Sequence, residues 1–127
     1  ESGELIRTFT GHKRPVYAIA FSPDGETLAS GSNNGQMILW RVESGKLQET
    51  IKAHKKEVTS LSFSADGDTL ASASGDKTIK LWNPANGELL RSLSDHSAGV
   101  TCVTFSPRGH FASGSKDRTI KIWREKS

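Results

Sequence analysis

Cysteine is almost absent from the sequence, since Cys102 is the only one in 127 residues. A single thiol excludes an intrachain disulfide and fits a reducing compartment such as the cytoplasm. Long hydrophobic runs are absent as well: the longest, residues 16–21, is far shorter than the roughly 20 residues of a membrane-spanning helix. We therefore expect neither a membrane span nor a signal peptide. The net charge of +3 is too small to indicate a nucleic-acid-binding protein by itself.

Motifs typical of metal and nucleotide sites are missing too. No Cys/His cluster has the spacing of zinc ligands, and no glycine-rich loop precedes a helix-like segment. Residues 66–68 (Asp-Gly-Asp) lack the remaining ligands of a calcium loop. Residues 113–116 match the spacing of a Ser-x-x-Lys nucleophile, but no helix is expected there to present the lysine. The sequence thus predicts no metal site and no cofactor.

A repeat of 41–42 residues covers nearly the whole sequence. The tryptophans are separated by 42 and 41 residues, and three of the four histidines and three of the five phenylalanines by 42 and 42. A period of this length indicates supersecondary units that stack on one another. The landmarks are Trp40, Trp82 and Trp123; His12, His54 and His96; and Phe21, Phe63 and Phe105.

Each period contains four short segments typical of β-strands. They are rich in β-branched and apolar residues, and Gly, Pro, Asn or Asp stands at the breaks between them. No stretch of ten or more residues has helical periodicity. The sequence therefore predicts an all-β protein whose repeats are sheets of four antiparallel strands. In the second repeat the segments are Val58–Phe63, Thr69–Ala73, Thr78–Trp82 and Glu88–Leu93.

Several motifs resemble those of the WD40 repeat family. They are FSPDG at Phe21–Gly25, LASGS at Leu28–Ser32, TIKLW at Thr78–Trp82 and TIKIW at Thr119–Trp123. The Asp that follows the tryptophan in the family is replaced in all three repeats, within loops. The resemblance implies WD40-type β-propeller blades, three per chain, in a single array over residues 1–127. We place the blades at about 5–45, 46–87 and 88–124.

The resemblance also implies a buried hydrogen-bonded tetrad of His, Ser, Asp and Trp in each blade. A buried Trp N–H needs an acceptor, Ser can supply it, and His can connect Ser to a carboxylate. A catalytic Ser-His-Asp triad is needed only once, whereas this set recurs in every repeat, which favours a structural role. Because Asn34 replaces Asp, the first tetrad is expected to be the weakest. The tetrads are His12, Ser30, Asn34 and Trp40; His54, Ser72, Asp76 and Trp82; and His96, Ser113, Asp117 and Trp123.

Two further expectations concern the first strands and the ends of the array. Val58, Leu61 and Phe63 do not share one alternation, which suggests a β-bulge with apolar contacts on both faces of the sheet. Cys102 falls on a core strand and is expected to be a buried, inert thiol. Residues 4–9 match the fourth strands at 46–51 and 88–93, and no such strand follows Trp123.

The resemblance implies that this first segment completes the last blade of a closed ring. Three blades are fewer than the 4–8 typical of propellers, so the segment is expected to complete a blade in another copy of the chain. Two copies give six blades, which we favour, and three copies give nine. The alternative is that the chain is part of a longer propeller.

One face of such a ring, the upper face, carries the loops that lead into the first strands and the turns before the third strands. These hold Lys13, Arg14, Lys55, Lys56, Lys77, Lys116 and Arg118. The opposite, lower face carries Asp24, Glu26, Glu43, Asp66, Asp68 and Glu88, with Arg41, Lys46, Arg108 and Arg124. By resemblance, the partner-binding positions on the upper face are Pro15, Tyr17 and Asn33; Glu57, Thr59 and Gly75; and Gly99, Thr101 and Lys116.

These observations favour a non-catalytic scaffold that binds a protein or peptide, with acidic or phosphorylated partners preferred by charge. Nucleic-acid binding by the basic upper face is the alternative. Tyr17 is the only residue expected there that could stack on a base, which argues against single-strand binding. An enzyme would need a catalytic constellation that is not repeated, and the sequence contains none.

Overall fold

The computed structural model describes residues 3–124, so residues 1–2 and 125–127 of the predicted array lie outside the described residues. Residues 3–124 form eleven strands and no helix, and therefore hold no helix that could cross a bilayer. The prediction of an all-β protein is confirmed. The strands are β1 (Val16–Phe21), β2 (Thr27–Ser32), β3 (Gln36–Arg41), β4 (Leu47–Lys52), β5 (Val58–Phe63), β6 (Leu70–Ser74), β7 (Ile79–Asn83), β8 (Glu88–Leu93), β9 (Val100–Phe105), β10 (His110–Ser115) and β11 (Ile120–Arg124).

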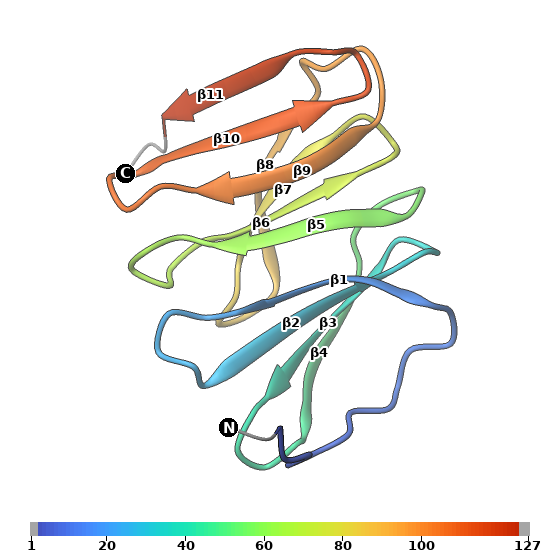
Figure 1. Cartoon of the computed structure of the whole chain (residues 1–127), viewed down its shortest axis with the longest axis vertical. Helices are drawn as coiled ribbons and strands as arrows, with labels where there is room; N and C mark the ends of the chain where they lie inside the picture. The colour runs from blue at the N-terminus through green and yellow to red at the C-terminus, as the bar shows by residue number, and fades with distance from the viewer. Residues whose placement is uncertain (1–2, 125–127) are drawn as a thin grey trace.

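The strands form three antiparallel sheets, one for each repeat, which we call blades 1, 2 and 3. Blades 1 and 2 have the orders β1-β2-β3-β4 and β5-β6-β7-β8, and blade 3 has the order β11-β10-β9. Figure 1 shows the blades stacked in chain order, with β1 beside β5 and β5 beside β9. Two of the four segments predicted in the second repeat have the bounds of β5 and β8, and the other two differ from β6 and β7 by one residue.

The predicted β-bulge is confirmed and occurs in every blade. The pairing of β5 with β6 joins Val58 to Ser74 and Ser60 to Ala73, so Thr59 is the extra residue. Tyr17 in β1 and Thr101 in β9 are left over in the same way. The bulge changes the alternation, so that Val58 and Leu61 face the same neighbouring blade and are both buried.

The hydrophobic core consists of two layers, one between each pair of neighbouring blades. In the first layer Ala18, Met37 and Leu39 of blade 1 pack against Leu61, Phe63 and Trp82 of blade 2 among other buried residues. In the second layer blade 2 packs on Val100, Val103 and Phe111 of blade 3. Each layer is built from both sheets, so a single blade buries neither of its faces alone.

The expectation for Cys102 is wrong, because its side chain is exposed. The position is equivalent to Ser60 in blade 2 and Ala18 in blade 1, which face the next blade along the chain. No described residue covers that face of blade 3, so the thiol there meets solvent. Position within the repeat alone does not determine burial at the end of an array.

Residues 3–15 form no strand in the single chain, and the expected pairing with another copy stays a prediction. No described strand pairs with this segment. The segment lies along blade 1, at the opposite end of the stack from β11 (Figure 1). The Phe9 ring lies 5.2 Å from the Trp40 ring in an edge-to-face contact, and Arg7 donates to the backbone carbonyls of Glu43 and Ser44.

Gly31 in β2 is expected to tolerate no larger residue. A Cβ added there would lie 2.4 Å from Cγ1 and 2.6 Å from Cβ of Val58, a stiff β-branched neighbour in the next blade. We predict that Gly31→Ala lowers the free energy of unfolding by roughly 1–3 kcal/mol, measured by urea denaturation. Val58→Ala removes both methyls, including Cγ1 at 2.4 Å, but keeps the Cβ at 2.6 Å, so part of the clash is relieved and the double variant should cost less than the sum of the single variants. Additive costs would contradict the packing described.

Candidate functional site

The tetrad of blade 2 is a continuous chain of hydrogen bonds. Trp82 donates its indole N–H to Ser72 Oγ at 2.9 Å, and Ser72 Oγ lies 2.8 Å from His54 Nε2. His54 Nδ1 lies 2.9 Å from Asp76 Oδ2. Since the carboxylate can only accept, Nδ1 carries the proton and Nε2 accepts from the serine hydroxyl. The chain of hydrogen bonds thereby links strands β6 and β7 to the loop at His54 and to the turn at Asp76.

Blade 3 contains the same chain. The Trp123 indole donates to Ser113 Oγ at 3.1 Å, and that oxygen lies 2.7 Å from His96 Nε2. His96 Nδ1 lies 2.8 Å from Asp117 Oδ2. A nucleophilic serine must be accessible to a substrate, whereas Ser72 and Ser113 are buried and bonded to a tryptophan.

The tetrad of blade 1 is incomplete. His12 Nε2 lies 2.6 Å from Ser30 Oγ, which accepts the Trp40 indole N–H at 2.9 Å. Asn34 does not reach the histidine. Its Oδ1 accepts hydrogen bonds from Ser32 Oγ and from the backbone N–H of Gln36. His12 Nδ1 has no hydrogen-bond partner among the described residues. The structure thus brings three of the four predicted residues together in this blade.

Two threonines that the sequence analysis did not identify belong to the complete networks. Thr78 Oγ1 donates to Asp76 Oδ1 at 2.6 Å, and Thr119 Oγ1 donates to Asp117 Oδ1 at 2.5 Å. The signal is an Asp-x-Thr pattern at 76–78 and 117–119, which blade 1 replaces with Asn34-Gly-Gln. The first blade therefore lacks both the carboxylate and the hydroxyl that holds it in place.

The network fixes the charge states of its members. Partial burial raises the pKa of Asp76, but the hydrogen bond from Thr78 and the charge and hydrogen bond of His54 outweigh burial and lower it from 3.8 to about 2. The Thr119 hydroxyl is the largest cause of the lowered pKa of Asp117. Burial lowers the pKa of His54, which therefore favours the neutral ring. The carboxylates are ionised at neutral pH, as acceptors for the histidines must be.

The predicted partner-binding residues lie in three equivalent groups on the upper face. One backbone hydrogen bond in each blade joins the loop before the first strand to the turn before the third strand. The bonds run from Asn33 N to Pro15 O at 3.0 Å, from Gly75 N to Glu57 O at 3.2 Å, and from Lys116 N to Gly99 O at 2.9 Å. Six of the nine residues are thus paired within their own blade.

The other three predicted residues are the bulged residues of the first strands. The Tyr17 side chain is exposed, and Thr101 Oγ1 donates to Gly114 O within its own blade. Thr59 Oγ1 instead donates to Val100 O of the next blade at 2.6 Å, so its hydroxyl already serves the contact between blades. A Cβ at Gly99 would lie 3.3 Å from Gly75 Cα, so these two glycines bring the rims of blades 2 and 3 together.

The cationic side chains predicted on the upper face are all exposed. Lys77 and Arg118 adopt φ values of 79° and 74°, the left-handed region in which blade 1 has Gly35. A side chain costs about 1–2 kcal/mol there relative to glycine, and such positions cluster at functional sites. The exposed cations are Lys13, Arg14, Lys55, Lys56, Lys77, Lys116 and Arg118.

Between blades 1 and 2 the lower face is acidic, whereas the upper face is basic. A hollow there is lined by Asp24, Glu26, Asp66 and Asp68, with Arg41 as the cation. The Ser22 hydroxyl and the Glu26 backbone N–H lower the pKa of Asp24. Residues 3–124 contain no group of three or more His, Cys, Asp or Glu side chains that could hold a metal ion.

The comparisons with known proteins agree with the blade geometry. The WD40 repeat (WD domain, G-beta repeat) matches residues 3–41, 45–83 and 87–124, which together span nearly the whole chain. The chain belongs to the WD40 repeat family. The predicted resemblance, with three repeats, is confirmed.

Individual relatives match one repeat at a time. The serine-threonine kinase receptor-associated protein of Homo sapiens is 46% identical over 41 residues, which are 32% of this chain and 12% of that protein. The intraflagellar transport protein 122 homolog of Danio rerio is 45% identical over 38 residues, which are 30% of this chain and 3% of that protein. The chain thus spans a small part of the curated relatives that it matches.

Among solved structures, U3-55K superimposes on 93% of this chain with a TM-score of 0.90 and 27% sequence identity. The WD40 repeats of RRP9 give the same values. In both cases the match covers 38% of the other chain. The blades of this WD40 chain therefore have the arrangement found in longer propellers.

The tetrads predict unequal effects of equivalent substitutions. Asp76→Ala removes the carboxylate that accepts from the buried His54 N–H and leaves only the Thr78 hydroxyl, 3.1 Å from Nδ1, so we expect a loss of roughly 1–3 kcal/mol in the free energy of unfolding. Asn34→Ala removes only the bonds that its Oδ1 accepts from Ser32 Oγ and Gln36 N, with none to the preceding loop, and should cost clearly less. Urea denaturation of both variants checks this. Equal costs would mean that the additional bonds of Asp76, to His54, Lys55 and Thr78, contribute nothing.

Acid is expected to destabilise the chain through Asp76. Because the folded pKa of about 2 lies below the ordinary 3.8, this carboxylate stabilises the fold above about pH 4, and the contribution is lost as the pH falls toward 2. The lowered pKa of His54 has the same sign and acts from about pH 6.5 downward. Urea midpoints between about pH 2.5 and 5 should fall less steeply for Asp76→Asn than for the unmodified chain. Asp68→Asn, at an exposed carboxylate outside the tetrads, is the control and should keep the original slope.

Proposed function

We propose that this WD40 chain is a non-catalytic scaffold that binds an acidic or phosphorylated protein segment on its upper face. Membership of the WD40 family and the likeness to propeller structures support an interaction scaffold in general. The preference for acidic partners is the finer proposal. The observation that carries it is the set of seven exposed cations on the loops and turns of the upper face.

The charges on this face are presented by a rigid frame. The complete tetrads hold the loops at His54 and His96 to the turns at Asp76 and Asp117, and Lys55, Lys77 and Lys116 stand next to these anchors. Phosphate and carboxylate groups form charge-assisted hydrogen bonds with lysine and arginine. The anchored backbone of these turns need not be ordered on binding, so the conformational cost is limited to the lysine and arginine side chains.

The predicted partner-binding residues of the upper face offer the remaining contacts with the bound segment. Tyr17 is half exposed, lies next to the basic loop at Lys13 and Arg14, and combines an apolar ring with a hydroxyl. Aromatic residues of this kind often dominate binding energy. We propose Tyr17 as the main apolar anchor, with Pro15, Asn33, Glu57, Gly75, Gly99, Thr101 and Lys116 around it and Thr59 mainly structural.

We further propose that copies of the chain assemble head to tail into a closed ring. The leading face of blade 1 consists of Val16, Ile19 and Phe21, which are 48%, 64% and 61% exposed. Their equivalents in blade 2, Val58, Leu61 and Phe63, are 0%, 7% and 9% exposed because blade 1 covers them. The same residue types are thus left open only where no preceding blade is present.

The trailing face of blade 3 is open in the matching way. It carries Cys102, Ile120 and Ile122, and the two isoleucines are 79% and 74% exposed. Their equivalents in blade 2, Ile79 and Leu81, are buried against blade 3. A leading face and a trailing face are the two halves of one repeated interface, so contacts between copies are heterologous and close into a ring if the rotation allows.

The number of copies follows from the size of stable propellers. Two copies give six blades, within the 4–8 typical of the fold, and three copies give nine. We therefore propose a dimer and treat the trimer as the alternative. In the ring the upper faces of all blades lie on one side, so assembly multiplies the cations available to a single acidic segment.

A charge-reversal experiment tests the proposed binding face. The upper-face variant carries Lys55→Glu, Lys77→Glu and Lys116→Glu, and the matched lower-face control carries Arg41→Glu, Lys46→Glu and Arg108→Glu. The probe is a fluorescent peptide with two phosphoserines flanked by glutamates. We expect the upper-face variant to bind about tenfold or more weakly, because each lost charge-assisted bond contributes on the order of 1 kcal/mol. The control should bind like the unmodified chain.

Other outcomes of this experiment separate the alternatives. Equal weakening by both variants would reduce the effect to net charge and contradict a defined site. No binding of the peptide by the unmodified chain, together with binding of duplex DNA that falls steeply with salt, would favour the nucleic-acid function.

A further inference from the structure

In the complete tetrads one carboxylate oxygen accepts two hydrogen bonds from the same loop. Asp76 Oδ2 accepts from His54 Nδ1 at 2.9 Å and from the backbone N–H of Lys55 at 3.2 Å. The equivalent bonds in blade 3 measure 2.8 and 3.1 Å. A side-chain N–H and a backbone N–H thus converge on a single anionic oxygen, and hydrogen bonds to a charged acceptor are stronger than those between neutral groups.

Blade 1 has both donors but not the acceptor. His12 and Lys13 stand in the equivalent positions. Because Ser30 Oγ accepts from the Trp40 indole, its own hydrogen is donated to His12 Nε2, 2.6 Å away. Burial lowers the pKa of His12, so the ring is neutral at neutral pH and its proton is on Nδ1. Neither that N–H, which is buried, nor the Lys13 N–H has an acceptor among residues 3–124.

The Asn34 side chain does not replace the missing carboxylate. Its Oδ1 accepts two hydrogen bonds within its own turn, and the residue is exposed, whereas Asp76 is partly buried. The His12 ring is partly exposed, whereas His54 and His96 are 3% and 4% exposed. The histidine of blade 1 is therefore the least covered of the three.

Packing keeps the two donors in place without the carboxylate. Gly11 lies against the Trp40 ring, where a Cβ would be 2.9 Å from Cη2. At the other end of the loop the Asn33 N–H donates to Pro15 O at 3.0 Å. The side chains of residues 13–14 add two exposed cations, so the loop presents hydrogen-bond donors and positive charge together.

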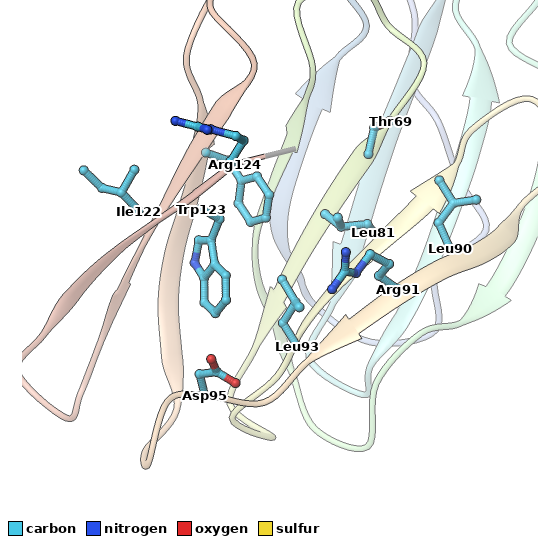
Figure 2. Close-up of a pocket in the computed structure, with 10 residues that line it drawn as sticks. Thr69, Leu81, Leu90, Arg91, Leu93, Asp95, Ile122, Trp123 and Arg124 are labelled. Carbon is cyan, nitrogen blue, oxygen red and sulfur yellow. The ribbon is translucent and has the colours of Figure 1, made fainter. Parts of the chain in front are cut away.

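The last tetrad shows that a more exposed tryptophan does not by itself leave a donor unpaired. Trp123 lies beside a hollow of about 520 Å³ between blades 2 and 3, and Figure 2 shows its ring facing Leu93. The ring is only partly buried, yet its N–H donates to Ser113 and the chain of bonds ends on Asp117. The unpaired N–H of His12 thus follows from the replaced aspartate.

We infer that blade 1 binds an oxyanion, a carboxylate or phosphate group of the acidic segment, on His12 Nδ1–H and the Lys13 N–H. The inference rests on the proposed function and gives one contact that the acidic partner makes. The bound oxygen takes the place that Asp76 Oδ2 has in blade 2 and completes the tetrad from outside the chain. Because Nδ1 is buried in the free chain, binding includes a small movement of the side chains around it. Blades 2 and 3 cannot bind in this way, since their own carboxylates hold the equivalent donors.

Proton–nitrogen NMR of the histidine rings tests the inference without the unidentified partner. The isotope-labelled full chain is titrated at neutral pH with sodium acetate or with sodium phosphate, and sodium chloride keeps the ionic strength constant. We expect the His12 Nδ1–H signal and the Lys13 amide signal to move downfield and to saturate, because both donors gain a charged acceptor. The His54 and His96 signals should stay in place. The ion with the stronger response identifies the source as a carboxylate or as a phosphate.

Two variants with the same added charge separate the site from a general effect of charge. Asn34→Asp supplies the internal carboxylate that blades 2 and 3 have, and should reduce the His12 shift about fivefold or more, because a tethered acceptor outcompetes a free ion. Its His12 signal should resemble those of His54 and His96 before any ion is added. Thr10→Asp is the matched control, at an exposed residue of the same loop outside the tetrad, and should keep most of the shift.

Each outcome decides for or against the anion site. A saturable shift of His12 that Asn34→Asp removes and Thr10→Asp keeps supports it. No shift with either ion, an equal shift at His54 and His96, or an equal loss in both variants would overturn it. The charge-reversal experiment changes blades 2 and 3 only, so failure of peptide binding together with a retained His12 shift would contradict the proposed function and not the anion site.

Discussion

Burial of blade faces against neighbouring blades is the interaction on which the rest of the structure depends. A four-stranded sheet with apolar residues on both faces cannot bury either face within itself. The effect is visible in single positions of the repeat: Val58 is fully buried and Val16 is half exposed, although both begin a first strand. The stability of each blade is therefore in large part the stability of its two interfaces.

The tetrads provide hydrogen-bond partners for the polar groups that are buried when the blades pack. Bringing the loop and turn of a blade together buries a tryptophan N–H and a histidine, and these need partners. Blades 2 and 3 supply the whole chain of donors and acceptors, ending on an ionised aspartate held by a threonine. Blade 1 stops at His12, whose Nδ1 is left without a described partner. The end blade of the array is thus less complete in its polar network as well as in its packing.

Much of the fold could be predicted because the same sequence pattern occurs in all three repeats. Strands β5 and β8 and the bulge after Val58 follow from residue pattern and period, and the contact of His54 with Ser72 was implied by the resemblance to WD40 repeats. The errors occur at residues whose burial depends on a neighbouring blade. Cys102 has the sequence context of a buried residue and lacks the blade that would bury it.

The site could be predicted less completely, for related reasons. The geometry of Asn34 depends on competing hydrogen bonds within its own turn, which the sequence does not rank. Thr59 was expected to face a partner and instead bonds to Val100 O of the next blade, a contact set by how closely two sheets approach. Residues 5–9 have the sequence of a strand, but a strand exists only where another edge accepts it.

The central claim is that the open leading face of blade 1 and the open trailing face of blade 3 are two halves of one interface. Light scattering on a sizing column, at several concentrations, tests this most directly by giving the native mass. We expect twice the chain mass of 13.8 kDa, with three times that mass as the nine-bladed alternative, and dissociation by Ile19→Asp, which places a charge in the interface. A stable monomer at all concentrations would contradict the claim.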